Sequence, residues 1–236
     1  MLKNKIALIT GAGSGIGEAT AMLFAQNGAS IVLADMDTDG AERVLAAIEK
    51  EGGKGMVVKT DVSKPAECEK LVAETVKKFG RLDIAVNNAG IGGPAALVGD
   101  YPIEDWDKVI AINLSGVFYG MRYQIPEMLK NGHGAIVNMA SILGKVGFPM
   151  SSAYVTAKHG VVGLTENAAL EYATQGIRVN AVGPGFIKTP LLDKNLTDEQ
   201  LTGIAAMHPM QRLGTAQEVA ELVLWLVSDK ASFVTG

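Results

Sequence analysis

Cysteine is nearly absent from this chain of 236 residues, and apolar runs long enough to cross a membrane are absent altogether. Its one cysteine, Cys68, has no partner for an internal disulfide, which fits a reducing compartment, so we expect a cytoplasmic protein. Glutamates flank Cys68 on both sides, and their charge should raise the thiol pKa and disfavour a nucleophilic role. Because a membrane span needs about 18 apolar residues, we expect no membrane partner.

Basic charge and histidine are also scarce. Lys and Arg total 21 against 25 Asp and Glu, which gives a formal net charge of −4 without any long basic tract. A nucleic acid, whose phosphates attract basic surfaces, is therefore not an expected partner. The three histidines, His133, His159 and His208, are scattered without metal-ligand spacing, so we expect no metal and assign them structural or solvated positions.

The sequence does contain a regular alternation of apolar runs and helical patterns. Nearly continuous Val, Ile, Leu and Ala is typical of strands buried on both faces of a parallel sheet. We predict strands at residues 6–9, 30–34, 55–59, 84–87, 135–139 and 178–182, and helices at residues 16–27, 38–51, 65–79, 103–130 (as two segments), 152–174 and 216–228. This alternation predicts one α/β domain over residues 1–236, a Rossmann-like doubly wound parallel sheet with helices on both faces. Residues 183–212 are the least regular segment and predict a lid or short helices.

A glycine-rich turn follows the first predicted strand and opens the first predicted helix. Its spacing is G-x-x-x-G-x-G through Gly11, Gly15 and Gly17, with Ser14 and Ile16 between them. Glycines permit close backbone approach and the N–H groups of a helix start attract anions, so the turn suits a pyrophosphate. A glycine-rich turn that binds no ligand is the alternative interpretation.

Asp35 ends the second predicted strand, where an acidic side chain is expected to bind the ribose hydroxyls of an adenine dinucleotide. Its carboxylate would repel a 2′-phosphate, and Asp37 adds a second negative charge nearby. No Arg or Lys lies in residues 12–14 or directly after Asp35 to neutralise such a phosphate. We therefore predict NAD(H) in preference to NADP(H) as the cofactor. A helix N-cap is a second role for Asp35, compatible with the first.

Tyr154 and Lys158 stand at positions i and i+4 of a predicted helix, thirteen residues after Ser141. These positions share one helix face, so the lysine ammonium should favour the phenolate and lower the pKa of Tyr154. Such a tyrosine can exchange a proton with an alcohol or carbonyl while the Ser141 hydroxyl holds the substrate. Because Tyr-x-x-x-Lys also occurs by chance on many helices, this assignment depends on the cofactor turn.

Together these motifs resemble the short-chain dehydrogenase/reductase family in its single-domain form. The resemblance covers essentially the whole chain. It is carried by seven motifs in the family's order: the glycine turn, Asp61-Val62, Asn87-Asn88-Ala89-Gly90, Asn113, Ser141, Tyr154 with Lys158, and Pro184-Gly185 running to Thr189. It implies an oxidoreductase that transfers a hydride between NAD(H) and a secondary alcohol or ketone, as NAD-dependent alcohol dehydrogenases and carbonyl reductases of the family do.

The resemblance also implies a role for each matching residue. The implied catalytic residues are Asn113, Ser141, Tyr154 and Lys158. The implied cofactor-binding residues are Gly11, Ser14, Gly15, Ile16, Gly17, Asp35, Asp61, Val62, Asn88, Ala89, Gly90, Tyr154, Lys158, Pro184, Gly185, Ile187 and Thr189. The backbone carbonyl of Asn113 would hold a water that relays protons from Lys158, although a bend at a poor helix former is the alternative.

Several alternatives stay open at this stage. A 3-oxoacyl-carrier-protein reductase or a sugar dehydrogenase would share the same motifs, and a non-catalytic NAD(H)-binding sensor or scaffold represents a different class. Apolar loops at residues 91–97, 142–148 and 186–210 suggest a moderately apolar substrate. Family members are mostly homotetramers, and they continue past a pair like Thr235-Gly236 into a last strand, so we expect a homotetramer and a seventh strand beyond this sequence.

Overall fold

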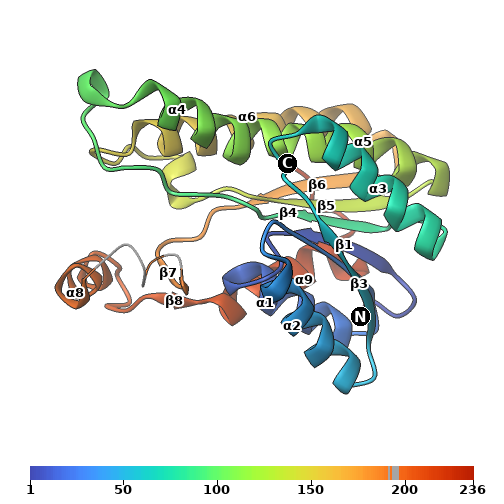
Figure 1. The fold of residues 1–236 in the computed structure, drawn as a ribbon. Helices are drawn as coiled ribbons and strands as arrows, with labels where there is room; N and C mark the ends of the chain where they lie inside the picture. The colour runs from blue at the N-terminus through green and yellow to red at the C-terminus, as the bar shows by residue number, and fades with distance from the viewer. Residues whose placement is uncertain (191, 193–196) are drawn as a thin grey trace.

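The computed structural model describes residues 1–190, 192 and 197–236. Within this part of the chain, six strands form one parallel sheet in the order β3-β2-β1-β4-β5-β6 (Figure 1). The strands are β1 (Ile6–Thr10), β2 (Ser30–Asp35), β3 (Lys54–Lys59), β4 (Ile84–Asn87), β5 (Gly134–Met139) and β6 (Ile177–Val182). Each matches a predicted strand to within one residue at either end. The predicted Rossmann-like parallel sheet is therefore confirmed.

Helices cover both faces of this sheet (Figure 1). One layer contains α1 (Gly15–Gln26), α2 (Thr38–Lys50) and α9 (Ala216–Val227). The other contains α3 (Pro65–Phe79), α4 (Ile103–Ile110), α5 (Gly116–Asn131) and α6 (Ser152–Tyr172). Short 3-10 helices lie at Val98–Asp100, Ile142–Gly144, Ala173–Gln175 and Asp229–Ala231. No helix among the described residues is both long and apolar enough to span a membrane.

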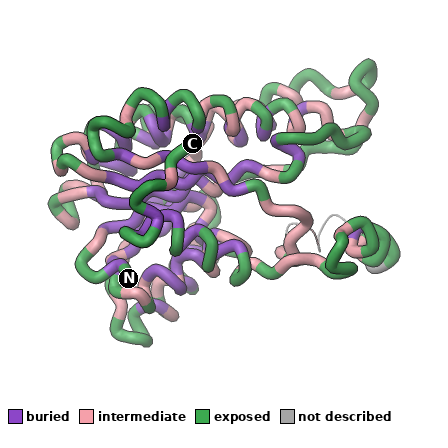
Figure 2. Tube along the Cα trace, turned by 180° about the vertical axis from the view of Figure 1, so that it is seen from behind, coloured by how far each residue is buried: buried purple, intermediate pink, exposed green. Residues whose placement is uncertain are grey.

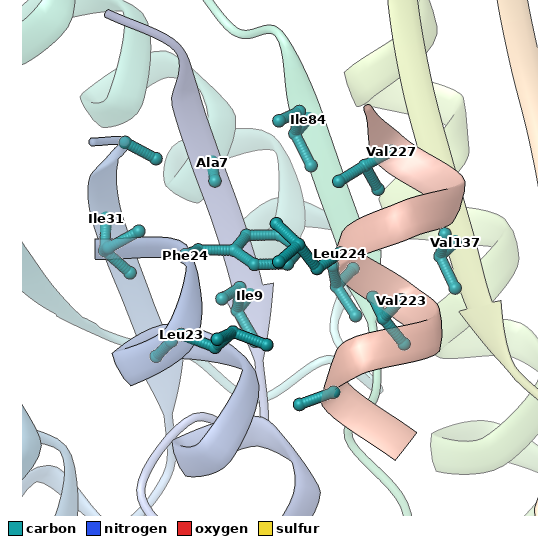
Figure 3. Close-up of a cluster of buried hydrophobic side chains, with 14 of the residues drawn as sticks. Ala7, Ile9, Leu23, Phe24, Ile31, Ile84, Val137, Val223, Leu224 and Val227 are labelled. Carbon is teal, nitrogen blue, oxygen red and sulfur yellow. The ribbon is translucent and has the colours of Figure 1, made fainter. Parts of the chain in front are cut away.

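Two apolar clusters join the helix layers to the sheet, because successive strand residues point to opposite faces. Ala7 and Ile9 of β1 belong to the first cluster, and Figure 3 shows Phe24 of α1 pointing across them toward Leu224 of α9. Leu8 belongs to the second cluster, under α5 and α6. Figure 2 shows that buried residues follow the strands. Burial on both faces explains why these strands read as continuous apolar runs.

The strand order reverses at β1, which has β2 on one side and β4 on the other. In the register of the sheet, Leu8 lies beside Val32 of β2 and Ala85 of β4. The chain leaves β1 toward one helix layer and β4 toward the other, so a crevice is expected outside their carboxyl ends. The glycine turn after β1 and the loop after β4 both lie at this switch point.

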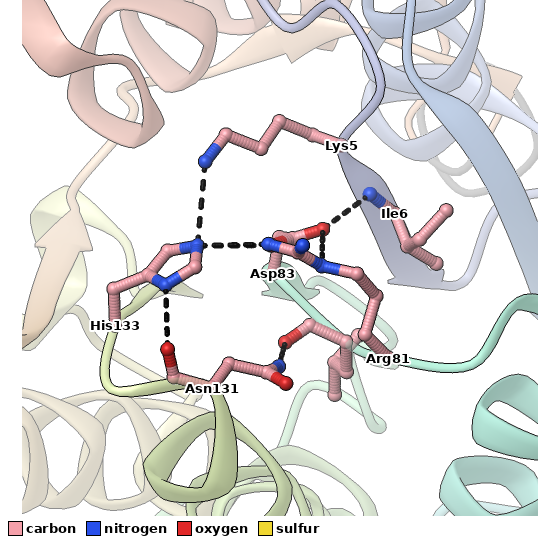
Figure 4. A network of polar contacts seen from close by, with 7 residues as sticks. Lys5, Ile6, Arg81, Asp83, Asn131 and His133 are labelled. Carbon is pink, nitrogen blue, oxygen red and sulfur yellow. Dashed lines mark hydrogen bonds and ion pairs between the residues drawn. The ribbon is translucent and has the colours of Figure 1, made fainter.

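A polar network joins the amino ends of β1, β4 and β5, at the end of the sheet opposite to the glycine turn (Figure 4). The buried Asp83 carboxylate accepts a hydrogen bond from Ile6 N at 2.8 Å and forms an ion pair with Arg81. His133 Nε2 lies 3.1 Å from the same carboxylate and 3.3 Å from Lys5 Nζ. The predicted structural role of His133 is therefore confirmed.

The irregular segment after β6 carries short elements of its own, as predicted. Within its described residues, β7 (Ile187–Lys188) pairs with β8 (Gly214–Thr215), and α8 (Asp198–Ala206) begins with a capping box. Residues 191 and 193–196 of the predicted segment lie outside the described residues. In Figures 1 and 2, α8 stands away from the sheet and is largely exposed.

Candidate active site

The glycine turn between β1 and α1 has a backbone shape that side chains would block. Gly11 and Gly15 have φ angles of 65° and 56°, which favour glycine, and a Cβ on Gly17 would lie 2.0 Å from Gly11 O. Ile16 packs against the first apolar cluster and anchors the start of α1. The N-cap residue Ser14 makes no capping hydrogen bond through its side chain, so the first N–H groups of α1 stay available. The turn fits a dinucleotide pyrophosphate.

Asp35 is held beside this turn by two backbone groups. Its Oδ2 accepts a hydrogen bond from Gly13 N at 2.8 Å, and its Oδ1 accepts one from Asp37 N at 2.9 Å. The N-cap role considered for Asp35 is wrong, because Asp37 caps α2 by accepting a hydrogen bond from Gly40 N. The Asp35 carboxylate is thus positioned at the end of β2, and its oxygens keep capacity to accept further hydrogen bonds.

Arg43 of α2 reaches the same turn, a contact that no sequence motif indicates. Its Nη2 donates to Gly13 O at 3.1 Å, and its guanidinium holds both oxygens of Glu18 at 2.6 and 2.7 Å. Glu18 lies in the first turn of α1. The hydrogen bond and the charge of Glu18 raise the pKa of Arg43 above its ordinary value. A basic group therefore lies at the turn, although none adjoins it in sequence.

The loop after β4 is tied to β1 and the turn through Asn88. The Asn88 amide donates to Thr10 O at 3.0 Å and to Gly11 O at 3.1 Å. Thr10 Oγ1 in turn accepts hydrogen bonds from the N–H groups of Asn88 and Ala89. Asn88 and Ala89, which the resemblance implies for cofactor binding, are thus at the switch point, and Asn88 holds the glycine turn in place.

Asp61 and Val62 follow β3 on the other side of β2. Asp61 Oδ1 accepts hydrogen bonds from Ser63 N at 2.9 Å and Ser63 Oγ at 2.7 Å. Val62 packs against the start of α5, since a Cβ on Gly116 would lie 2.9 Å from Val62 Cγ2. Both residues follow β3 at the carboxyl end of the sheet, and the resemblance implies that they bind the cofactor.

Asn113 lies in a π-helical turn, η2 (Ala111–Ser115), between α4 and α5. Its side chain is fully buried, accepts a hydrogen bond from Ile91 N at 2.8 Å and donates one to Ile91 O at 2.7 Å. A Cβ on Gly90 would lie 3.2 Å from Asn113 Oδ1. The predicted interruption of the helix is confirmed, and its form is a π-turn, which occurs often at functional sites.

Lys158 of α6 is buried beneath the site, with 3% of its surface exposed. Its Nζ donates to Met139 O, at the end of β5, at 2.6 Å and lies 5.5 Å from the centroid of the Tyr154 ring. Burial lowers the pKa of Lys158 to about 8. A Cβ on Gly90 would lie 3.8 Å from Lys158 Nζ, so the loop after β4 closes over this ammonium.

The Tyr154 side chain lies near enough to Ser141 for the serine to affect its pKa. Ser141 caps the 3-10 turn that follows β5, where its Oγ accepts from Leu143 N at 3.1 Å. Burial raises the pKa of Tyr154, and the Ser141 side chain opposes that rise. The expected lowering of this pKa by Lys158 is wrong for the cofactor-free protein. Desolvation of the phenolate is the larger effect, and Lys158 Nζ is engaged by Met139 O.

The segment after β6 returns to both halves of the site. Ile142 N donates to Pro184 O at 2.8 Å, which joins this segment to the Ser141 loop. Thr189 lies over the glycine turn, because a Cβ on Gly15 would lie 3.3 Å from Thr189 Cγ2. Ile187 packs against the first apolar cluster. The segment thus spans from the predicted catalytic residues to the predicted pyrophosphate site.

Three aromatic rings connect this segment to α8 and to the loop before α6. The Phe186 ring contacts Phe148 at 5.9 Å and His208 at 5.8 Å between centroids. His208 Nε2 accepts from Phe186 N at 3.1 Å and its Nδ1 faces Ile204 O at 2.9 Å, which requires the neutral ring. A Cβ on Gly185 would lie 2.6 Å from His208 Nε2. His208 is structural, as predicted. Its position beside the site is visible only in the folded structure.

Cys68 and His159 lie outside this constellation. Burial, with the charge of Glu67 as a smaller effect, raises the pKa of the Cys68 thiol to about 11, so the prediction of an unreactive cysteine is supported. His159 is exposed on α6, with Nδ1 2.9 Å from Val155 O. Cys68 Sγ donates to Val62 O at 3.5 Å, so its contact with the carboxyl edge of the sheet is structural.

Comparison with known proteins agrees with this arrangement. Residues 11–236 match the family model described as "Enoyl-(Acyl carrier protein) reductase". The chain is 49% identical to a cyclohexanol dehydrogenase of Acinetobacter sp. (strain SE19), over 99% of this chain and 91% of that protein. It is 42% identical to a 3-oxoacyl-[acyl-carrier-protein] reductase of Thermotoga maritima, over 100% of this chain and 95% of the relative.

A solved structure shows the same similarity in three dimensions. NAD⁺-bound xylitol dehydrogenase superposes with a TM-score of 0.93 at 33% identity, covering 99% of this chain and 96% of that one. Whole-chain matches at these identities exceed what a shared fold alone would produce. The sequence motifs, the parallel sheet and the relatives together establish that the chain belongs to the short-chain dehydrogenase/reductase family, and that it is an oxidoreductase acting on alcohol or ketone groups.

Proposed function

We propose that this protein is an NAD(H)-dependent dehydrogenase that interconverts a cyclic secondary alcohol, with cyclohexanol as the reference substrate, and its ketone. The observation that carries the proposal is the grouping of Ser141, Tyr154 and the buried Lys158, whose Nζ lies 5.5 Å from the Tyr154 ring centroid, at the same end of the sheet as the glycine turn. When bound, the nicotinamide accepts the hydride of the carbinol carbon or returns it to the ketone. The protein supplies position and proton transfer.

Tyr154 exchanges the proton and Ser141 positions the substrate oxygen. In the alcohol-to-ketone direction, the hydroxyl proton passes to the Tyr154 oxygen as the carbinol C–H bond breaks. In the reverse direction Tyr154 gives its proton to the carbonyl oxygen. Because burial raises the pKa of Tyr154, its resting form is the neutral acid, which is the form that ketone reduction needs. Lys158 stabilises the phenolate when it forms.

The residues of the carboxyl edge fit a dinucleotide. The turn from Gly11 to Gly17 would hold its pyrophosphate, and Asp35 would accept hydrogen bonds from the adenosine ribose. Thr189, lying over Gly15, would face the nicotinamide end. The preference for NAD(H) rests on Asp35, whose carboxylate lies 2.8 Å from Gly13 N and repels a 2′-phosphate.

An apolar ring is the substrate that best suits the surrounding side chains. Phe148 and Phe186 stack edge to face beside the Ser141 loop, and Ile142 at its tip is 45% exposed. These groups favour an uncharged ring over an acidic substrate. Lys145, the nearby candidate for a carboxylate or a carrier phosphate, forms an ion pair with Glu166 at 3.7 Å. A cyclic alcohol also agrees with the cyclohexanol dehydrogenase relative.

Two properties of the whole molecule complete the proposal. Exposed apolar side chains on the outer faces of the helices and at the chain's end suit subunit contacts in a homotetramer, namely Ile103, Phe118, Leu170, Leu222, Trp225 and Phe233. Sedimentation at micromolar concentration should give a tetramer, and a monomer would contradict this part. The single buried Cys68 supports a cytoplasmic location.

The test follows NADH oxidation with cyclohexanone, an acyclic ketone of equal carbon number and a 3-oxoacyl thioester, with NADPH in parallel. Cyclohexanone with NADH should give the largest kcat/KM. A larger kcat/KM for the thioester would favour the carrier-protein reductase function. A larger kcat/KM for a keto-sugar, assayed in the same way, would favour a sugar dehydrogenase. NADH binding without turnover of any of these carbonyl compounds would favour the sensor or scaffold.

A further inference from the structure

The contact between Arg43 and Glu18 lies directly against the proposed cofactor site. Gly13 joins the two sides of this contact: its N–H donates to Asp35 Oδ2 at 2.8 Å and its carbonyl accepts from Arg43 Nη2 at 3.1 Å. One residue of backbone therefore separates the ribose-binding carboxylate from a guanidinium. A 2′-phosphate on that ribose would come within the reach of an arginine side chain.

Glu18 occupies the hydrogen-bonding edge that a phosphate would need. Both Glu18 oxygens are bound by Arg43, at 2.6 and 2.7 Å, in the bidentate geometry that guanidinium also uses for phosphate. The Arg43 and Glu18 side chains are 59% and 31% exposed, so water and salt weaken their attraction. The bidentate hydrogen bonds still fix the orientation of the guanidinium. The charge of Arg43 is thereby neutralised at the turn.

We propose that Glu18 is a second determinant of the preference for NAD(H), acting with Asp35, because it holds Arg43 away from a 2′-phosphate. This inference rests on the proposed cofactor preference. With Glu18 present, the Arg43 edge that would bind phosphate is occupied and Asp35 supplies repulsion. With Glu18 neutralised, Arg43 is free to turn from the pair toward the phosphate and offset part of that repulsion. Arg43 is a latent phosphate-binding residue.

The experiment compares equilibrium binding of NADPH and NADH, measured by nucleotide fluorescence on the unmodified protein and on Glu18→Gln. Glu18 lies in the first turn of α1, so removing its charge should strengthen binding of both nucleotides. The ratio of the two dissociation constants isolates the effect of the 2′-phosphate. We expect this ratio to shift about three- to tenfold toward NADPH at low salt and less at 0.5 M salt, as for an exposed charge contact.

Two further variants show whether the shift of the ratio toward NADPH depends on Arg43. Glu42→Gln removes an equal charge from an exposed position on α2, and it should leave the ratio within about twofold of the wild type. Arg43→Gln combined with Glu18→Gln should abolish the gain, as coupling between neighbouring groups requires. Thermal unfolding confirms that each variant is folded.

The possible results separate this inference from the proposed preference. An unchanged ratio in Glu18→Gln, a gain that persists without Arg43, or an equal gain in Glu42→Gln overturns the inference. A wild-type protein that binds NADPH as tightly as NADH overturns the proposed preference instead, whatever the Glu18 variant shows. A shift in the ratio toward NADPH that is restricted to Glu18→Gln and depends on Arg43, in a protein that prefers NADH, supports the inference.

Discussion

The buried Lys158 ammonium should make the stability of the cofactor-free protein depend on alkaline pH. Burial lowers the pKa of Lys158 from its ordinary value of 10.5 to about 8. The folded chain therefore releases this proton more readily than the unfolded chain, and between about pH 8 and 10.5 rising pH favours the folded state. Below about pH 8 this contribution is constant, because the ammonium is charged in both states.

The perturbation is Lys158→Met, which keeps an unbranched side chain one heavy atom shorter and removes the titrating group. The gap between the two pKa values corresponds to about 3 kcal/mol. The free energy of unfolding of the wild type, minus that of the variant, should therefore rise by about 3 kcal/mol between pH 7.5 and 10.5. The variant also loses the hydrogen bond to Met139 O. This loss changes the free-energy difference by the same amount at pH 7.5 and at pH 10.5, so it cancels.

Urea unfolding at fixed protein concentration, without cofactor, measures each free energy. Lys70→Met is the matched control, because the Lys70 side chain is 68% exposed and pairs with Glu74 on the surface. Its difference from the wild type should stay within about 0.5 kcal/mol across the same pH range. A change of less than about 1 kcal/mol for Lys158→Met would refute the reasoning from burial.

Three other substitutions test the site directly. Tyr154→Phe should lower kcat by about 10²–10⁴-fold while NADH binding stays within a few fold, and near-normal turnover would remove Tyr154 from its role. Asn113→Ala removes both hydrogen bonds to the Ile91 backbone and leaves a cavity where a fully buried side chain was, so urea unfolding should show a loss of about 2–4 kcal/mol; a loss below about 1 kcal/mol contradicts this role of Asn113. Phe186→Ala removes the ring between Phe148 and His208 and should raise KM for cyclohexanone more than it lowers kcat, whereas an unchanged KM would place the substrate elsewhere.

The sheet could be predicted because its strands are buried on both faces. Residues such as Leu8 and Ile9 are fully buried on opposite sides of β1, so the apolar run is continuous and its meaning unambiguous. The glycine turn could also be predicted, because Gly11 and Gly17 lie where a side chain would clash or strain the backbone. Local chemistry of this kind is visible in the sequence.

Contacts that depend on how elements pack could not be predicted. Arg43 meets Gly13 only because α2 returns along α1, and no local pattern states which face of α2 turns inward. The pKa of Tyr154 is raised and not lowered as predicted, for a related reason. The i, i+4 spacing shows that Lys158 is near, but not that burial outweighs its charge or that Met139 O engages the ammonium. The low helix propensity of asparagine likewise indicates a bend at Asn113 but not its π geometry.

The π-turn at Ala111–Ser115 also determines how the long helical segment tolerates changes in length. Such a turn is in effect one residue inserted into an α-helix, and each residue of an α-helix turns the chain by about 100°. Val109 on α4 and Val117 on α5 are both buried with that extra residue present. Deleting one residue between them would restore regular helix yet rotate one apolar face toward solvent. A homologue with one residue fewer in this stretch would have to repack α4 or α5 as a whole.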